Sequence, residues 1–188
     1  MTVSTTLLLI ISAFWVASEI GLAVLRRSSA GAARKDSGSL VILNVVIYVS
    51  IALGMYLGAT GRGRLATPVP VFWLGLVAIV LGLAVRWWAV ISLRRFFTVD
   101  VAIHADHRLV QKGPYRFIRH PAYAGCLLSF AGLAVCGSSW LSILVILAPI
   151  TGAFLYRIRV EERALLNAFP SEYREYSART FRIIPGLF

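Results

Sequence analysis

The longest apolar stretch of the chain, residues 121–156, reads PAYAGCLLSFAGLAVCGSSWLSILVILAPITGAFLY. A helix needs about 20 apolar residues to cross the roughly 30 Å hydrocarbon core of a membrane, so this stretch is too long for one crossing. Gly137-Ser138-Ser139 interrupts it near the middle, and clusters of glycine and serine favour turns. The sequence therefore predicts two shorter helices, over residues 121–137 and 140–157, joined by a tight turn.

Three further apolar runs are long enough to span a membrane, at residues 5–25, 40–59 and 69–93. The first has no basic flank and no convincing cleavage site, so we interpret it as a retained span and not as a signal peptide. Hydrophobic residues make up 59% of the 188 residues and charged residues 14%, which excludes an ordinary soluble globule, a disordered chain and a coiled coil. We expect an all-α, polytopic membrane bundle of five transmembrane helices, with residues 1–188 forming a single integral-membrane domain.

The basic residues predict the orientation of this bundle. The chain carries 19 Lys and Arg against 8 Asp and Glu, a formal net charge of +11. Apolar spans separate the basic residues, which favours a membrane over a nucleic acid as the partner. Sixteen of them lie in the first and third loops and in the carboxyl-terminal tail, and cytoplasmic loops collect Lys and Arg. We expect the amino terminus outside, and the polar segments 94–120 and 157–188 in the cytoplasm.

Residues 107–125 connect the third loop to the fourth span, and residues 114–123 within them combine two tyrosines, a histidine, two arginines and two prolines. Gly113-Pro114 predicts a turn, because glycine tolerates unusual dihedral angles and proline fixes φ. His120-Pro121 precedes the fourth span, where proline suits the first helical turn and free amide groups attract acceptors. An interfacial loop with aromatic anchors is the alternative interpretation.

The segment after the fifth span keeps the spacing of an amphipathic helix at Leu165, Leu166 and Phe169, so the last span is expected to continue beyond the membrane. Arg157 and Glu161 are four residues apart and share one helix face. They predict either a polar site at the membrane mouth or a simple surface ion pair.

Arg86 lies about seven residues inside the cytoplasmic end of the third span, where a charged side chain needs a partner or a polar cavity. Glu19 in the first span is a candidate partner, and snorkelling of Arg86 to the interface is the alternative. Cys126 and Cys136 lie inside an apolar run without a CxxC pattern, so we expect two buried small hydrophobes. Neither a disulfide nor a metal site is indicated.

The sequence resembles the isoprenylcysteine carboxyl methyltransferase family over about residues 75–188, and more distantly the phospholipid N-methyltransferases. The motifs that carry the resemblance are the glycine-tyrosine-arginine-histidine-proline run at residues 113–125, Arg86-Trp87-Trp88 with Phe97-Thr98, and Glu161-Glu162 followed by Phe169, Tyr173, Tyr176, Arg182 and Pro185. The chain departs from the family at Phe169-Pro170, where many members have glycine after phenylalanine, and it lacks the extra amino-terminal spans of animal members.

The resemblance implies a membrane methyltransferase that uses S-adenosyl-L-methionine and releases S-adenosyl-L-homocysteine. The cytoplasmic loop and the helical tail would form the cofactor pocket, and a lipophilic acceptor would enter from the bilayer. Catalytic roles are implied for Arg157, Glu161 and Glu162, and acceptor contacts for Arg157, Arg86 and Trp88. The residues implied in cofactor binding are His107, Leu109, Val110, Gly113, Tyr115, Arg119, His120, Pro121, Tyr123 and Glu161.

The chemistry is consistent with these residues. A carboxylate acceptor is already ionised at pH 7 and needs no general base, and a desolvated site favours the reaction of a sulfonium cation with a carboxylate anion. The acceptor can be the carboxylate of an isoprenylcysteine-like lipid, another acidic lipid, or the amine of a phospholipid. Two other classes of protein compete with this interpretation, an NADPH-dependent lipid or steroid reductase and a non-enzymatic membrane scaffold.

Overall fold

The computed structural model describes residues 3–25, 33–34, 38–65, 68–97, 102–103 and 109–186. Helices dominate this part of the chain, and the predicted all-α class is confirmed. A two-residue antiparallel pair, β1 with β2, and two short 3₁₀ turns are minor additions. The elements in chain order are α1 (Val3–Leu25), β1 (Ala33–Arg34), α2 (Ser39–Ala59), α3 (Pro68–Leu93), η1 (Arg94–Phe96), β2 (Ala102–Ile103), η2 (Gly113–Arg116), α4 (Pro121–Cys136), α5 (Trp140–Ala168) and α6 (Pro170–Ala178).

Four of these helices, α1, α2, α3 and α5, are long and apolar enough to cross a membrane. The fifth predicted span corresponds to α4, which has 16 residues. At 1.5 Å per residue it is about 24 Å long, shorter than the roughly 30 Å of a typical hydrocarbon core. The chain is therefore an integral membrane protein with four supported spans, and a fifth crossing by α4 stays a prediction.

The predicted break between the fourth and fifth apolar segments is confirmed at residues 137–139. Ser138 has a φ of 49°, and Ser139 is extended and caps α5 by accepting a hydrogen bond from the backbone of Ser142. The Ser139 hydroxyl also donates to the Arg62 carbonyl at 2.6 Å, which ties this turn to the α2–α3 loop. Local turn chemistry and hydrogen bonds to the α2–α3 loop thus fix the α4–α5 connection.

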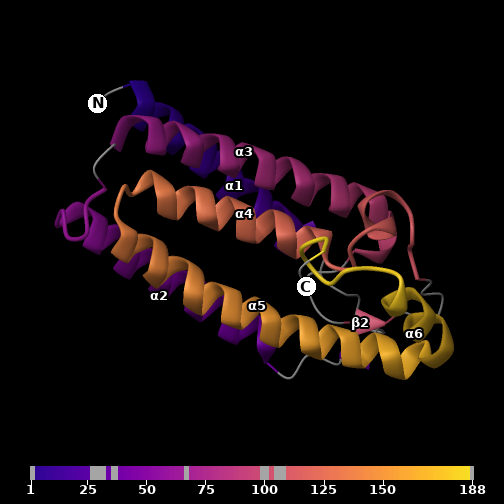
Figure 1. Cartoon of the computed structure of the whole chain (residues 1–188). Helices are drawn as coiled ribbons and strands as arrows, with labels where there is room; N and C mark the ends of the chain where they lie inside the picture. The colour runs from indigo at the N-terminus through magenta and orange to yellow at the C-terminus, as the bar shows by residue number, and fades with distance from the viewer. Residues whose placement is uncertain are drawn as a thin grey trace.

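The helix α5 has 29 residues and continues beyond its apolar part to Ala168, as the amphipathic spacing predicted. It ends before Pro170, which lacks a backbone donor and cannot extend the helix but suits the first turn of α6. Figure 1 shows α6 at the end of the bundle away from the amino terminus, with the tail running back from it toward α4.

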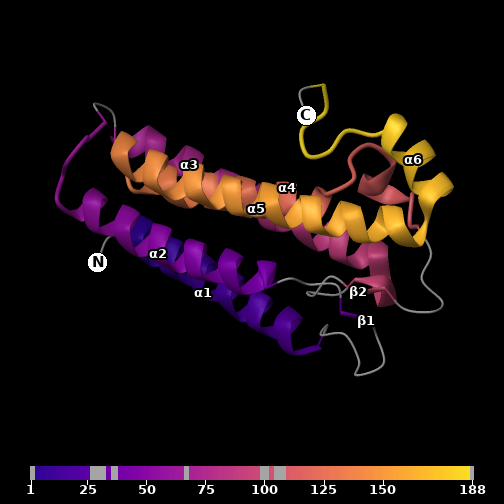
Figure 2. The ribbon, with the colours of Figure 1, turned by 90° about the horizontal axis from the view of Figure 1, so that it is seen from below.

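The helix α4 packs between α3 and α5, and α2 packs against α5. Figure 2 shows two layers, with α1 and α2 below α3, α4 and α5. The contact of α3 with α4 needs glycine: a Cβ at Gly125 would lie 2.6 Å from the backbone nitrogen of Arg86. Small residues of this kind let membrane helices approach closely.

Phe130 and Ile146 belong to the buried core between the helices, and Cys126 is buried beside them as expected. Cys136 differs from the prediction, because it is only half-buried. It lies at the last position of α4, where the surrounding helices cover less of its side chain.

Candidate functional site

The two polar segments that the sequence singled out lie against each other at one end of the bundle. The backbone nitrogen of Arg119 donates to the Phe181 carbonyl at 2.8 Å, and that of His120 donates to the Arg182 carbonyl at 3.1 Å. In return the Phe181 nitrogen donates to the Phe117 carbonyl at 3.0 Å. The tail thus pairs with the segment that leads into α4, next to the extension of α5.

Glu161, on the extension of α5, faces the start of α4. The Tyr123 hydroxyl donates to Glu161 Oε2 at 2.8 Å, and His120 Nδ1 lies 3.9 Å from the same oxygen. The rings of His120 and Tyr123 stack with centroids 5.7 Å apart, and the Phe154 ring packs against Tyr123 in a tilted arrangement at 5.3 Å. A carboxylate with 32% of its side chain exposed therefore borders a wall of aromatic rings.

Arg157 lies one turn before Glu161 on the same face of α5, and only 2% of it is exposed. Its Nη1 donates to the Ser39 hydroxyl at the start of α2 at 2.8 Å, and its guanidinium lies beside the Tyr123 hydroxyl. Buried charges are costly unless they are paired and hydrogen-bonded. The structure thus places a buried guanidinium and a partly exposed carboxylate around one tyrosine hydroxyl.

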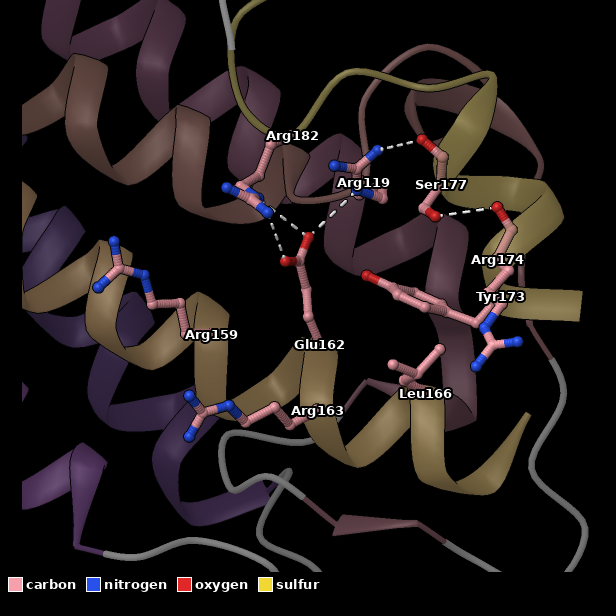
Figure 3. A pocket seen from close by; sticks show the side chains of 9 residues that line it. All are labelled: Arg119, Arg159, Glu162, Arg163, Leu166, Tyr173, Arg174, Ser177 and Arg182. Carbon is pink, nitrogen blue, oxygen red and sulfur yellow. Dashed lines mark hydrogen bonds and ion pairs between the residues drawn. The ribbon is translucent and has the colours of Figure 1, made fainter. Parts of the chain in front are cut away.

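Glu162 has different partners from its neighbour, because consecutive helical residues point about 100° apart. Arg182 Nη2 contacts Glu162 Oε2 at 3.0 Å, and Arg119 Nε and His120 Nε2 lie 3.2 and 3.3 Å from Oε1. Figure 3 shows the two arginines converging on this carboxylate. Arg119 also donates to the carbonyls of Ser177, at 2.7 Å, and Thr180. This ion-pair cluster joins α5, α6, the tail and the start of α4.

Two tyrosines fasten α6 to the loop. The Tyr176 hydroxyl donates to the Tyr115 carbonyl at 2.8 Å. Burial raises the pKa of the Tyr176 hydroxyl, and burial together with the nearby Glu161 charge raises that of Tyr115. Both phenols are therefore neutral at physiological pH, and the Tyr176 hydroxyl remains a donor.

Inside the bundle, Arg86 of α3 pairs with Glu19 of α1, as predicted. Arg86 Nε bonds Glu19 Oε1, and Arg86 Nη2 donates to Oε2 at 2.6 Å. Only 8% of Arg86 is exposed, whereas Trp88, two residues further along α3, is 53% exposed. Both side chains were expected to contact the methyl acceptor, but the structure does not bring them together, because Arg86 and Trp88 lie on different sides of α3.

The remaining residues expected at the cofactor site lie along the loop into α4. Leu109 and Val110 are half-buried, and Pro121 is fully buried at the first turn of α4. Gly113 adopts a φ of 60°, and a Cβ there would lie 2.7 Å from the Ser92 hydroxyl, so glycine suits this position. His107, the other loop residue singled out, lies outside the described residues.

A family model described as the isoprenylcysteine carboxyl methyltransferase (ICMT) family matches residues 73–167, just over half of the chain. The chain belongs to this family. A rice (Oryza sativa subsp. indica) relative, named as a probable protein-S-isoprenylcysteine O-methyltransferase, is 34% identical over 117 residues, which cover 61% of this chain and 61% of the relative. Protein-S-isoprenylcysteine O-methyltransferase B of Arabidopsis thaliana is 34% identical over 113 residues, covering 59% and 57%.

A solved structure of a eukaryotic intramembrane Ras methyltransferase, ICMT, superimposes with a TM-score of 0.56 and 26% sequence identity. The match covers 80% of this chain and 53% of that protein. The chain thus spans little more than half the length of these ICMT-family relatives. The resemblance noted from the motifs is confirmed at the level of the family and the fold.

Sequence reasoning missed several contacts of this ICMT-family site, among them the bond between Arg157 and Ser39. The two residues are 118 positions apart, and no motif connects them. The available signal was weak: a serine directly after Gly38, at the start of an apolar run. Tyr173 and Arg182 were noted as parts of a motif. The spacing could not predict the ion pair of Arg182 with Glu162 or the position of Tyr173 beside it.

Proposed function

We propose that this chain is a membrane methyltransferase that transfers the methyl group of S-adenosylmethionine to the carboxylate of an isoprenylcysteine-like or other lipophilic acceptor. The observation that carries the proposal is the arrangement of Arg157 and Glu161 around the Tyr123 hydroxyl, at the end of a membrane bundle of the ICMT family. It places a group suited to an anionic acceptor within one helical turn of a group suited to a cationic donor.

The residues around Glu161 fit a sulfonium cofactor by their chemistry. Glu161 Oε2 accepts from Tyr123, and Oε1 has no hydrogen bond within the described part of the chain, so the carboxylate can still accept from ribose hydroxyls or balance a cation. The stacked rings of His120 and Tyr123 offer aromatic faces, which attract cations. The other residues of the proposed cofactor site would be Leu109, Val110, Gly113, Tyr115 and Pro121, with His107.

When bound, S-adenosylmethionine supplies a methyl group on positively charged sulfur. Arg157 would hold the acceptor carboxylate through its guanidinium fork, and its burial keeps water away from that charge. Because the carboxylate is ionised at pH 7, the protein need only orient it and exclude water. Of the two further side chains expected at the acceptor, Trp88 is exposed on α3 and would contact it from the membrane side, whereas Arg86 is engaged with Glu19 inside the bundle.

Glu162 and Arg119 would support this site through their neighbours. The ion-pair cluster holds His120, whose ring stacks on Tyr123, and it keeps the tail on the loop. We therefore assign them positioning roles, in place of the catalytic role first expected for Glu162 and the cofactor contact expected for Arg119.

The proposed topology has the amino terminus outside and both polar segments in the cytoplasm, as the distribution of Lys and Arg favours. The helix α4 would make the fifth crossing in a locally thinner membrane, and residues 1–188 would form one methyltransferase domain. Cytoplasmic S-adenosylmethionine would then reach Glu161 directly, while the acceptor enters from the bilayer.

The test uses the full chain in lipid nanodiscs, incubated with methyl-labelled S-adenosylmethionine and an N-acetylated S-farnesylcysteine. We expect a base-labile methyl ester, as an ester of a carboxylate requires, and loss of labelling in Glu161→Gln but not in Arg62→Gln at the other end of the bundle. Calorimetric titration with S-adenosylhomocysteine and with NADPH separates the methyltransferase from a reductase. Binding of NADPH alone, with no label in the probe or in a host lipid extract, would refute the proposal.

A further inference from the structure

A hollow lies on the Glu162 side of the α5 extension, and Glu161 does not line it. It has a volume of about 390 Å³ and is bordered by α5, α6 and the tail. Five arginines line it, around the single carboxylate of Glu162: Arg119, Arg159, Arg163, Arg174 and Arg182. The pocket is therefore strongly positive.

Glu162 cannot balance this charge, because it is already engaged with Arg119 and Arg182. Arg159 and Arg163 are both exposed and four residues apart on α5, so they share one face of the helix. Neither forms an ion pair with any residue in the described ranges. Like charges at this spacing repel each other, and a bound anion would remove that repulsion.

Tyr173 provides an independent observation. Only 5% of this residue is exposed, and its buried hydroxyl makes no hydrogen bond within the part of the chain that the structure describes. Figure 3 shows the hydroxyl pointing toward the Arg119–Glu162 pair, at the edge of the pocket. A buried donor without an acceptor is destabilising, so an acceptor from a ligand would stabilise this side of the pocket.

We propose that this pocket binds a phosphate group. A phosphate offers several charged acceptor oxygens at once, which suits the guanidinium forks of Arg159 and Arg163 together with the Tyr173 hydroxyl. A single carboxylate offers fewer acceptor sites for so many donors.

The position of the pocket makes a lipid headgroup one source of that phosphate. The apolar part of α5 ends near Tyr156, and the lining residues Arg159 to Leu166 follow within about 5–15 Å along the helix. Lipid headgroups occupy about 5–8 Å on each side of the hydrocarbon core. Inorganic phosphate or a soluble phosphate ester is the other source.

The full chain in detergent is titrated with phosphatidic acid or with phosphatidylcholine, and bound lipid is counted by native mass spectrometry. We expect phosphatidic acid to be retained at least fivefold more than phosphatidylcholine. Arg163→Gln should lower its retention about three- to tenfold, and Tyr173→Phe should lower it while keeping the buried ring. Arg62→Gln is the matched control, with the same loss of charge at an exposed position near the α2–α3 turn.

Inorganic phosphate in excess separates the two sources. If excess phosphate displaces phosphatidic acid, the pocket binds the phosphate group by itself. If phosphatidic acid stays bound despite excess phosphate, the pocket binds the lipid headgroup. Equal retention of both lipids would overturn the proposal, as would equal losses in Arg163→Gln and Arg62→Gln. None of these readouts depends on methyl transfer, so the result is independent of the proposed activity.

Discussion

Replacement of Glu161 or Glu162 by glutamine should affect two different properties of the protein. Glu162→Gln removes the charge that Arg119, Arg182 and His120 share, whereas Glu161→Gln removes a carboxylate that accepts one hydrogen bond from Tyr123. We expect Glu162→Gln to lower the stability of the protein and Glu161→Gln to lower cofactor affinity with little change in stability.

The size of the stability effect follows from burial. The side chains of Glu162 and Arg119 are 15% and 11% exposed, and that of Arg182 is 31% exposed. Breaking a fully buried pair costs about 3–5 kcal/mol, and partial exposure reduces this to about 2–3 kcal/mol here. For a chain of this length, each kcal/mol corresponds to about 2–4 °C, so the unfolding midpoint of Glu162→Gln should fall by about 5–10 °C.

The measurement is thermal unfolding in a fixed detergent, followed by size-exclusion chromatography of the heated samples. S-adenosylhomocysteine affinity is measured in parallel by calorimetry at a temperature where all variants are folded. Equal midpoints for the two variants would contradict the assignment of Glu162 to an ion-pair cluster. Unchanged affinity in Glu161→Gln would contradict the assignment of Glu161 to the cofactor.

Three further substitutions test other parts of the structure. Tyr123→Phe removes the 2.8 Å bond to Glu161 and should weaken S-adenosylhomocysteine binding about tenfold in calorimetry; wild-type affinity would show that the bond does not orient the carboxylate. Arg157→Ala should abolish methyl transfer in the labelling assay while cofactor affinity survives, and normal turnover would reject its role toward the acceptor. Gly125→Ala forces a Cβ to within 2.6 Å of the α3 backbone and should lower the unfolding midpoint, whereas Gly152→Ala, with open space around it, should not; equal midpoints would argue against the close α3–α4 contact.

The helices could be predicted from the sequence because membrane crossing imposes a length and a composition that few other structures share. The break at residues 137–139 was readable for a similar reason, since glycine and serine determine the local backbone. The Arg86–Glu19 pair was also predictable, because a charge inside a span needs a partner and the first span offers a carboxylate.

The contacts within the site could not be predicted to the same depth. Spacing places Glu161 and Glu162 side by side, but only the packed structure shows which of them faces Tyr123 and which meets Arg182. Arg119 was expected at the cofactor, yet carbonyl groups of α6 and the tail bind it more than 50 residues away in sequence. Such partners depend on how the chain returns to the bundle, which local patterns do not encode.

The pairing of the tail with the segment before α4 has an evolutionary consequence. Phe181 and Arg182 engage residues 117–120 through backbone atoms, so this attachment does not require particular side chains at Phe181. We therefore expect other residues to be tolerated at this position, except for proline, which would remove the donor to the Phe117 carbonyl. Shortening of the chain before Phe181 would remove these backbone bonds together with the Arg182–Glu162 pair, and would leave α6 held by the contacts of Tyr176 and Arg119.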